Sequence, residues 1–297
     1  MAGGRFDVVV VGSLNQDLVA TVPRIPAPGE TVLASGHAAF AGGKGANQAT
    51  AAARLGANVA MVGRVGADAN GSTLREGLAG DGIDVSRVLI DDEAATGLAL
   101  INVDAAGENA ITVSPGANGA VTAADVTAAT DLLEVAAVVL LQLEVPIEAV
   151  SAAAELARGI VILNPAPAAE LPTGLLENVD ILVPNESELA SLAGAHTATE
   201  DEVAAAARSL PVSEVVVTLG ARGALVVSKS GIKHVPPVPV DPVDTTGAGD
   251  AFCGALAAEL ARGSYVQAAA RFAAKVAAHA VTKHGAQASM PTRDELT

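Results

Sequence analysis

The clearest chemical potential in this chain lies in the segment Asp244-Thr-Thr-Gly-Ala-Gly-Asp250, which runs directly into an Ala-rich stretch of helical period. Glycines before a helix N-terminus allow close backbone approach, and the free N–H groups with the positive dipole end attract an anion. An anion beside a carboxylate indicates phosphoryl transfer, with Asp250 accepting a proton from a hydroxyl. The amides of Gly247, Ala248 and Gly249 would stabilise the transferring group. Taken alone, Asp250 could instead simply cap the helix.

A second glycine cluster, Ala41-Gly-Gly-Lys-Gly-Ala-Asn-Gln-Ala49, also runs into a helical stretch and places Lys44 and Asn47 on its first turns. It is not a P-loop, because Lys44 is followed by Gly45 rather than Ser or Thr. The sequence also lacks a Gly-x-Gly-x-x-Gly dinucleotide fingerprint. The cluster is either a helix cap with a solvated lysine or part of a site for a small polar molecule.

The elements that must position these motifs follow an alternating pattern. Short apolar runs alternate with longer Ala-rich stretches of helical period, which is typical of a parallel sheet covered by helices. The expected strands are 7–11, 58–63, 137–141, 160–163, 180–183 and 214–218. The expected helices are 45–55, 147–157, 201–210, 250–262 and 265–282.

Two β-rich regions, 18–40 and 88–113, interrupt this alternation without an intervening helix. We expect both to be antiparallel insertions that stand off the main sheet. The chain, 1–297, is therefore predicted to be one main α/β domain with a small β accessory layer.

Composition excludes several classes of function. The chain has 17 basic and 33 acidic residues, a net charge of −16, and only 2% aromatic residues, which argues against a nucleic-acid partner. Its single cysteine, Cys253, excludes an intramolecular disulfide and is given no role, and the five histidines do not fall at zinc-ligand spacing. No segment resembles a signal peptide or a membrane span, so the expectation is a cytoplasmic protein with no membrane partner.

Together the two glycine motifs resemble the signatures of the phosphofructokinase B, or ribokinase-like, carbohydrate kinase family. Further segments resemble this family in order along the chain: 12–17, 28–31, 142–144, 164–167, 184–188, 218–223 and 283–287. The resemblance implies a parallel sheet flanked by helices with a small antiparallel β lid, formed by insertions at roughly 17–40 and 88–114. By resemblance, such lids pair two subunits into a homodimer.

The resemblance also implies an activity, the ATP-dependent phosphorylation of D-ribose at O5 to ribose 5-phosphate and ADP. Transfer would be direct and in-line, with Asp250 as the base, and carboxylates, amides and one ammonium suit a substrate with several hydroxyls. The positions that match the sugar-binding residues are Asn15, Asp17, Gly42, Gly43, Lys44, Asn47, Glu144 and Asp250.

Nucleotide and magnesium positions are implied in the same way. The matching nucleotide-binding residues are Asn185, Thr218, Gly220, Arg222, Gly223 and Gly249, and Glu188 would act on Mg²⁺ through water. As isolated residues, Asn185 and Glu188 would be a helix N-cap and a first-turn acid, and the segment from Thr218 a turn between strands.

A potassium site is implied near the C-terminus, built mostly from main-chain carbonyls with Asp244 supplying charge. The alternative is a loop that packs against a C-terminal helix. The matching positions are Asp244, Thr246, Ala280, Lys283, Gly285 and Ser289.

Three alternatives to a ribose kinase stay open at this stage. The equivalent of Asn15 in deoxyribose kinases of the family resembles Met, and an amide that pairs a 2-hydroxyl is left unsatisfied by a deoxy sugar, so Asn15 favours ribose. An adenosine or fructose kinase is a second alternative. The third, from a different class, is a non-catalytic sugar-binding sensor, against which the retained Gly247, Gly249 and Asp250 argue.

Overall fold

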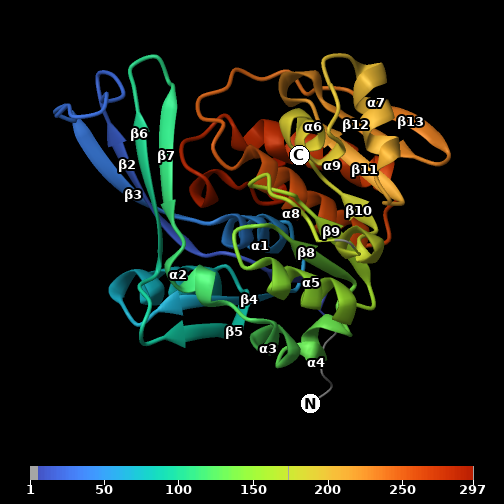
Figure 1. Cartoon of the computed structure of the whole chain (residues 1–297), viewed down its shortest axis with the longest axis horizontal. Helices are drawn as coiled ribbons and strands as arrows, with labels where there is room; N and C mark the ends of the chain where they lie inside the picture. Colours follow the sequence, from blue (N-terminus) through green and yellow to red (C-terminus); the bar gives the residue numbers. More distant parts are fainter. Residues whose placement is uncertain (1–5, 173, 297) are drawn as a thin grey trace.

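The computed structural model describes residues 6–172 and 174–296, and their strands belong to two sheets (Figure 1). The larger sheet contains β1 (Val8–Val11), β4 (Val59–Gly66), β5 (Asp84–Asp91), β8 (Val138–Leu141), β9 (Ile160–Leu163), β10 (Ile181–Leu182), β11 (Glu214–Thr218), β12 (Ala224–Ser228) and β13 (Gly231–Val235). The smaller sheet contains β2 (Asn15–Thr21), β3 (Gly36–Gly42), β6 (Gly97–Val103) and β7 (Asn109–Ser114).

The large sheet has the strand order β13-β12-β11-β10-β9-β8-β1-β4-β5 across the described residues. Its strands from β11 to β5 run parallel, and β12 and β13 are added antiparallel at one edge. The predicted fold class, an α/β parallel sheet flanked by helices with a small β lid, is confirmed.

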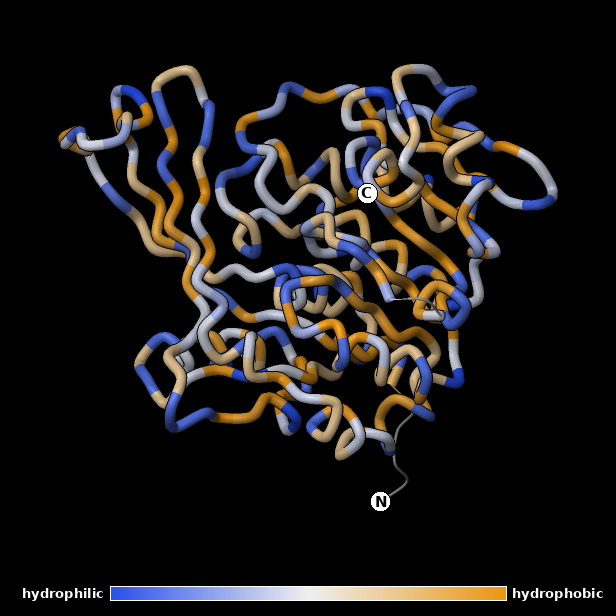
Figure 2. Tube along the Cα trace, in the orientation of Figure 1, coloured by the Kyte–Doolittle hydropathy of each residue, from blue (hydrophilic) through white to orange (hydrophobic). Residues whose placement is uncertain are grey.

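Helices cover both faces of the large sheet, and strand β1 shows why. Val8 and Val10 pack into one core with α1 (Lys44–Arg54), α8 (Ala248–Ala261) and α9 (Val266–Ala280). Val9 and Val11 pack into a second core with α5 (Ile147–Leu156) and α7 (Glu200–Ser209). All four valines are buried, as a strand covered on both faces requires. Figure 2 shows the central strands as hydrophobic. The helices are α1 (Lys44–Arg54), α2 (Ala69–Gly80), α3 (Ala123–Thr127), α4 (Thr130–Leu133), α5 (Ile147–Leu156), α6 (Glu186–Ala193), α7 (Glu200–Ser209), α8 (Ala248–Ala261) and α9 (Val266–Ala280).

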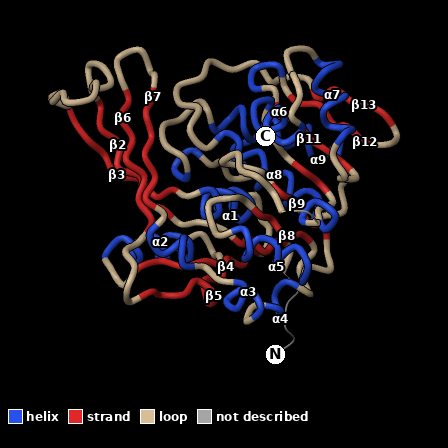
Figure 3. The backbone as a smooth tube through the Cα atoms, viewed as in Figure 1, coloured by secondary structure: helices blue, strands red, loops and turns tan. Residues whose placement is uncertain are grey.

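The small sheet, ordered β3-β2-β6-β7, stands away from the helix-covered sheet and is called the lid below (Figure 3). It differs from the expectation in two details. The second insertion was expected at 88–114, but 84–91 form β5, which pairs in parallel with β4 after the crossover helix α2. The lid is also not purely antiparallel, because β2 and β6 pair in parallel.

The motifs found in the sequence converge on the carboxyl ends of the parallel strands. Residues 12–15 follow β1, Gln142 to Glu144 follow β8, Asn164 follows β9, and Asn185 lies just beyond β10. Crevices at this edge of an open α/β sheet are the usual place for a ligand. Among the described residues, no helix is long and apolar enough to cross a membrane.

Candidate active site

Asp250 lies in the first turn of α8, just after Gly247, which has φ 75° and caps the helix. Its side chain is buried, and both carboxylate oxygens accept hydrogen bonds from α1. Asn47 Nδ2 donates to Oδ2 at 2.9 Å and Gln48 Nε2 donates to Oδ1 at 2.9 Å. The two helices come close because Gly254 has no side chain, and a Cβ there would lie 2.5 Å from the Gln48 carbonyl oxygen.

Burial raises the pKa of Asp250, while Lys44 and the two amide donors Asn47 and Gln48 lower it and Glu144 raises it further. The net shift is upward. A raised pKa brings the group closer to the range in which a general base works well.

Lys44 contributes the positive charge beside Asp250. Burial acts to lower the pKa of its ammonium, but the carboxylates of Asp250, Glu144 and Glu188 act against burial, and the net shift is upward. Lys44 is therefore a cation held between carboxylates. Cys253 lines a pocket beside Asp250 together with Lys44. Burial and the charge of Asp250 raise the pKa of its thiol well above the usual value, so the reactive thiolate is disfavoured.

Glu144 joins the segment after β8 to the start of α1. Its Oε2 accepts hydrogen bonds from Ser13 Oγ at 2.5 Å and from the backbone N–H of Lys44 at 3.0 Å. Asp17, on lid strand β2, is close enough to Glu144 for their charges to interact. Burial, followed by the charges of Glu144 and Asp250, raises the pKa of Asp17 to about 7.

Glycines are required just before α1 because atoms of the β2 segment lie very close to the backbone there. A Cβ at Gly42 would lie 2.2 Å from Asp17 Oδ2, and a Cβ at Gly43, which has φ 87°, would lie 2.7 Å from the Asn15 nitrogen. Any larger residue would separate the helix from the lid strand. The structure thus brings the predicted sugar residues Asn15, Asp17, Gly42, Gly43, Lys44, Asn47, Glu144 and Asp250 to one region.

Asn15 is held by a residue that sequence reasoning missed. Asn118, in the 3₁₀ turn Gly116–Ala120, donates through Nδ2 to Asn15 Oδ1 at 2.7 Å and to the Leu14 carbonyl at 3.0 Å. Its Oδ1 accepts from the Leu14 N–H at 2.9 Å. With its oxygen engaged, Asn15 has its NH₂ group left to donate to a ligand. Ser13, Gln48, Gln142 and Asn164 were also missed as members of the site, although all four fall within or beside recognised motifs.

A pocket beside Asp250 holds several predicted nucleotide and phosphate residues. Among those lining it are Lys44, Asn185, Glu188, Thr218, Gly247, Ala248, Gly249 and Asp250. Asn185 and Thr218 pair directly through an isolated β-bridge. These residues come from four separate places in the sequence, and the fold gathers them at the N-terminus of α8.

Asn185 and Glu188 also form the helix cap that was the alternative interpretation from sequence. Asn185 Oδ1 accepts from the Glu188 N–H and Glu188 Oε2 accepts from the Asn185 N–H, both at 2.8 Å. Capping uses one carboxylate oxygen of Glu188 and leaves the residue on the pocket wall. Burial raises the pKa of Glu188, against the backbone hydrogen bond and Lys44, which lower it.

The Gly220–Arg222 turn lies outside the lining of this pocket. Gly220 and Gly223 have φ values of 57° and 88°, and a Cβ at Gly223 would lie 2.1 Å from the Val235 carbonyl oxygen. Arg222 is exposed and pairs with Glu186 on α6. The turn joins β11 to β12, which agrees with the turn alternative and leaves the role in nucleotide binding a proposal.

A family model described as "pfkB family carbohydrate kinase" matches residues 5–293. The chain belongs to the pfkB family of carbohydrate kinases. It is 39% identical to the ribokinase of Haemophilus influenzae over 98% of this chain and 97% of that protein. It is also 39% identical to the deoxyribokinase of Salmonella typhi over 98% and 97%. The structure of Arabidopsis thaliana ribokinase complexed with ribose and ATP superimposes with a TM-score of 0.89 at 34% identity, covering 99% of this chain and 98% of that one.

In this carbohydrate kinase, the residues predicted to bind potassium lie where the loop before α8 meets the C-terminal segment. Asp244 Oδ2 accepts from the Gly285 N–H at 2.8 Å, and its Oδ1 accepts from the Thr246 N–H at 2.9 Å. The Asp244 N–H itself donates to the Val281 carbonyl. Lys283 is directed away, because its Nζ pairs with Glu295 at 2.7 Å. Ala280 and Ser289 lie on the same C-terminal segment.

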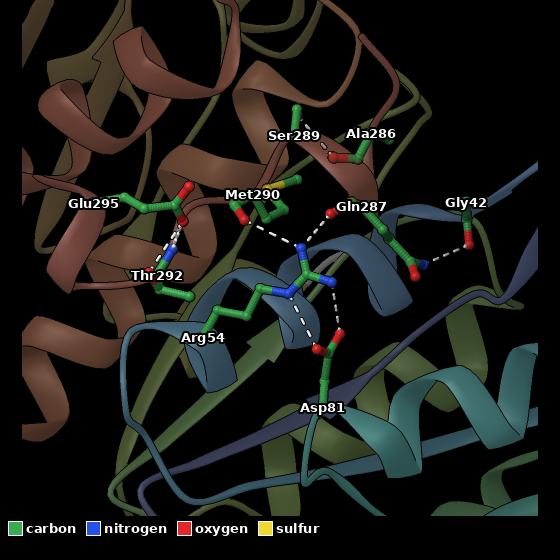
Figure 4. A network of polar contacts seen from close by, with 9 residues as sticks. All are labelled: Gly42, Arg54, Asp81, Ala286, Gln287, Ser289, Met290, Thr292 and Glu295. Carbon is green, nitrogen blue, oxygen red and sulfur yellow. Dashed lines mark hydrogen bonds and ion pairs between the residues drawn. The ribbon is translucent and has the colours of Figure 1, made fainter. Parts of the chain in front are cut away.

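Arg54 fixes this segment against α1 (Figure 4). Its Nη1 donates to the carbonyls of Gln287 at 2.6 Å and Met290 at 3.1 Å, and its Nε and Nη2 bind Asp81 in a bidentate pair. Gln287 Nε2 reaches the Gly42 carbonyl at 3.5 Å. The segment that would hold the cation is therefore connected to the glycines that shape the sugar site.

Proposed function

We propose that this chain transfers the γ-phosphoryl group of ATP to O5 of D-ribose, giving ribose 5-phosphate and ADP. The observation that carries the proposal is the buried Asp250 carboxylate, held by two amides at the glycine-flanked N-terminus of α8 and next to Lys44. Asp250 accepts the hydroxyl proton while the oxygen attacks in line. Free amides at the helix start and the Lys44 ammonium stabilise the negative charge of the transferring group.

Ribose, rather than 2-deoxyribose, is the proposed sugar. Overall similarity does not separate the two, because the chain is equally identical to a ribokinase and to a deoxyribokinase. The distinction comes from Asn15, whose oxygen is occupied by Asn118 and whose NH₂ group remains to pair with a hydroxyl. A buried amide donor without a partner would disfavour a sugar that lacks the hydroxyl.

The residues present fit a magnesium ion that arrives with the nucleotide. Among the described residues, no group of three or more His, Cys, Asp or Glu side chains could hold a metal ion by itself. Glu188 supplies one carboxylate to the pocket wall, which suits an ion that keeps most of its water and takes its other ligands from phosphates. Bound there with ATP, magnesium would neutralise phosphate charge.

Potassium is proposed as an activating cation near Asp244. Its proposed ligands are the Asp244 carboxylate and the main-chain carbonyls at 246, 280, 283, 285 and 289, because oxygen ligands of this kind suit a weakly hydrated cation. Desolvation opposes ionisation of Asp244, but hydrogen bonds from Thr246 and Gly285 outweigh it, and the pKa of Asp244 is lowered. A charged carboxylate is therefore available beside the loop that leads into α8.

We also propose that the lid pairs two copies of the chain. Lid residues Leu100, Ile111 and Val113 are exposed to 44%, 55% and 45%. Register places Leu100 on the opposite face of the sheet from the other two, so both faces of the lid carry exposed apolar side chains. Exposed apolar area of this kind on a four-stranded sheet is typical of an interface.

The activity is tested by a coupled assay of ADP release with ribose, 2-deoxyribose, adenosine and fructose, each with and without potassium and with magnesium chelated. We expect turnover with ribose, little with the other three, and loss of turnover on chelation. Absence of turnover with every sugar would contradict the kinase assignment and favour a sugar-binding sensor. Equal turnover of ribose and 2-deoxyribose would contradict the role of Asn15.

A further inference from the structure

A chain of three buried amide side chains, from Gln48, Asn164 and Gln142, lies against Asp250. Gln48 is the centre of this chain, and its side chain is fully buried. Gln48 Nε2 donates to Asp250 Oδ1 at 2.9 Å and to Asn164 Oδ1 at 3.2 Å. Gln48 Oε1 accepts from Gln142 Nε2 at 2.7 Å, and Asn164 Nδ2 donates to the Val183 carbonyl at 2.9 Å.

The direction of these hydrogen bonds fixes the orientation of the Gln48 amide. Asp250 Oδ1 and Asn164 Oδ1 both accept from the Gln48 NH₂ group, so Gln48 turns its oxygen toward Gln142, whose NH₂ group donates to it. A reversed amide would place an oxygen against the Asp250 carboxylate. Gln142 is itself buried and lies tightly against Gly12, where a Cβ would come within 2.0 Å of Gln142 Oε1.

We infer that Gln142 and Gln48 are positioning residues that hold the Asp250 base oriented and ionised for the proposed phosphoryl transfer. Neither residue is among those lining the pocket beside Asp250, so they act through Asp250 rather than on the reacting atoms. The inference rests on the proposed function, since it concerns the same base. It makes Gln142, which does not contact Asp250, a determinant of the rate.

The direction in which Gln48 shifts the pKa of Asp250 agrees with this hydrogen-bond geometry. Burial raises the pKa of Asp250, and the hydrogen bond from Gln48 is one of the interactions that lower it. A hydrogen bond to the ionised form favours that form. Removing the donor is therefore expected to raise the pKa of Asp250. The other titratable groups that interact with Asp250 come from several elements, and they are Asp17, Lys44, Glu144, Glu188 and Cys253.

The experiment is the pH dependence of kcat for three variants, with thermal melting and calorimetric ribose binding measured on each. Gln48→Met removes the donor while roughly conserving the shape of the side chain. Gln142→Glu replaces the donor toward Gln48 by a carboxylate, which turns the Gln48 NH₂ group away from Asp250. Gln142→Met removes the donor without imposing the reversed orientation, and it is the matched control for Gln142→Glu.

For Gln48→Met and Gln142→Glu, we expect the acid limb of the kcat–pH profile to move to higher pH by about one unit, so that kcat on that limb falls about tenfold. At pH 9, kcat should return to within about threefold of the unmodified chain, and ribose affinity should change little. Gln142→Met should lie between these variants and the unmodified chain. A folded Gln48→Met variant whose kcat falls equally at every pH, or whose profile does not move, would overturn the inference.

Gln142→Glu keeps the test decisive if Gln48→Met does not fold, because it leaves Gln48 in place. If the unmodified chain turns over no sugar, the proposed function fails before the inference is reached. If the unmodified chain is active and the profile of every folded variant matches it, only the inference fails.

Discussion

Asp250 is the residue on which the proposed chemistry depends, and substitution by the isosteric amide separates its two roles. Asp250→Asn keeps the volume of the side chain but cannot accept a proton from a hydroxyl. We expect kcat to fall by at least about 10². Ribose affinity should be retained within a few-fold, because Lys44, Asn47 and Glu144 remain. Measured by calorimetry, loss of affinity in step with kcat would instead indicate that Asp250 acts mainly as a structural cap.

Asp17 makes the stability of the fold depend on pH. Its pKa is raised to about 7 by burial and by the nearby carboxylates, whereas an aspartate in the unfolded chain titrates near 3.8. Between these values the folded state binds more protons than the unfolded state, so stability falls as pH rises. We expect Asp17→Asn to remove this loss. Its Tm should exceed that of the unmodified chain at pH 8, with a smaller difference at pH 5.

A matched control for this prediction is Asp92→Asn at an exposed position. Its Tm difference from the unmodified chain should be the same at pH 5 and pH 8. If Asp17→Asn behaves like this control, the pKa of Asp17 is not raised by the fold. Ribose binding by Asp17→Asn is a separate measurement, and we expect it to be weaker because the carboxylate proposed to bind the sugar has been lost.

At the scale of elements, the entry into α1 depends on a glycine that no other residue replaces. Gly43 has φ 87°, and its backbone lies against Asn15 and Leu14. We expect Gly43→Ala to cost about 1–3 kcal/mol of stability from the backbone conformation, with an added loss from displacement of the helix. Ribose affinity should also fall, because Lys44 and Asn47 move with the helix. Both effects are measured by chemical denaturation and calorimetry.

Gly77→Ala is the matched control within another helix. Gly77 is exposed in α2, and a Cβ there would meet no atom within 4 Å. We expect this variant to be more stable by about 0.5–1 kcal/mol, since alanine has the higher helix propensity, with ribose affinity unchanged. If both glycine variants behave alike, the close approach at Gly43 has no energetic consequence.

At the scale of the whole molecule, the lid leads to a prediction about assembly. We expect the chain to sediment as a dimer at micromolar concentration, and Ile111→Lys to shift it to a monomer because a charge would be buried at the interface. Val135→Lys is the control, because Val135 is similarly exposed at 44% but lies outside the lid. A monomeric unmodified chain would contradict the dimer, as would a dimer that Ile111→Lys leaves intact.

The overall charge of −16 also has a consequence at this scale. The field of an acidic protein does not attract a nucleotide triphosphate, so binding must be local. The pocket beside Asp250 provides Lys44 and the amides at the start of α8 for this purpose. Few aromatic residues are available for stacking, so we expect the sugar to be held by hydrogen bonds that amides donate and carboxylates accept.

Much of the fold could be predicted because its local signals are strong. The strands β1, β4, β8, β9, β10 and β11 and the helices α1, α5, α7, α8 and α9 all lie within a few residues of the expected ranges. The second half of strand β5 was assigned to the lid, because the β-rich region 88–113 continues without an intervening helix. The strand follows β4 through the crossover helix α2, and the parallel pairing with β4 shows that β5 completes the large sheet.

The sequence by itself determined the two glycine motifs, the alternation of strands and helices and the candidate for the base, because each signal lies in residues close together along the chain. Tertiary structure decided what surrounds the base. Gln48 and Asp250 are 202 positions apart, and Asn15 and Asn118 are 103 apart. Hydrogen bonds over such separations leave no local periodicity. They form because parallel strands bring their carboxyl ends to one edge of the sheet, where buried polar groups must find partners.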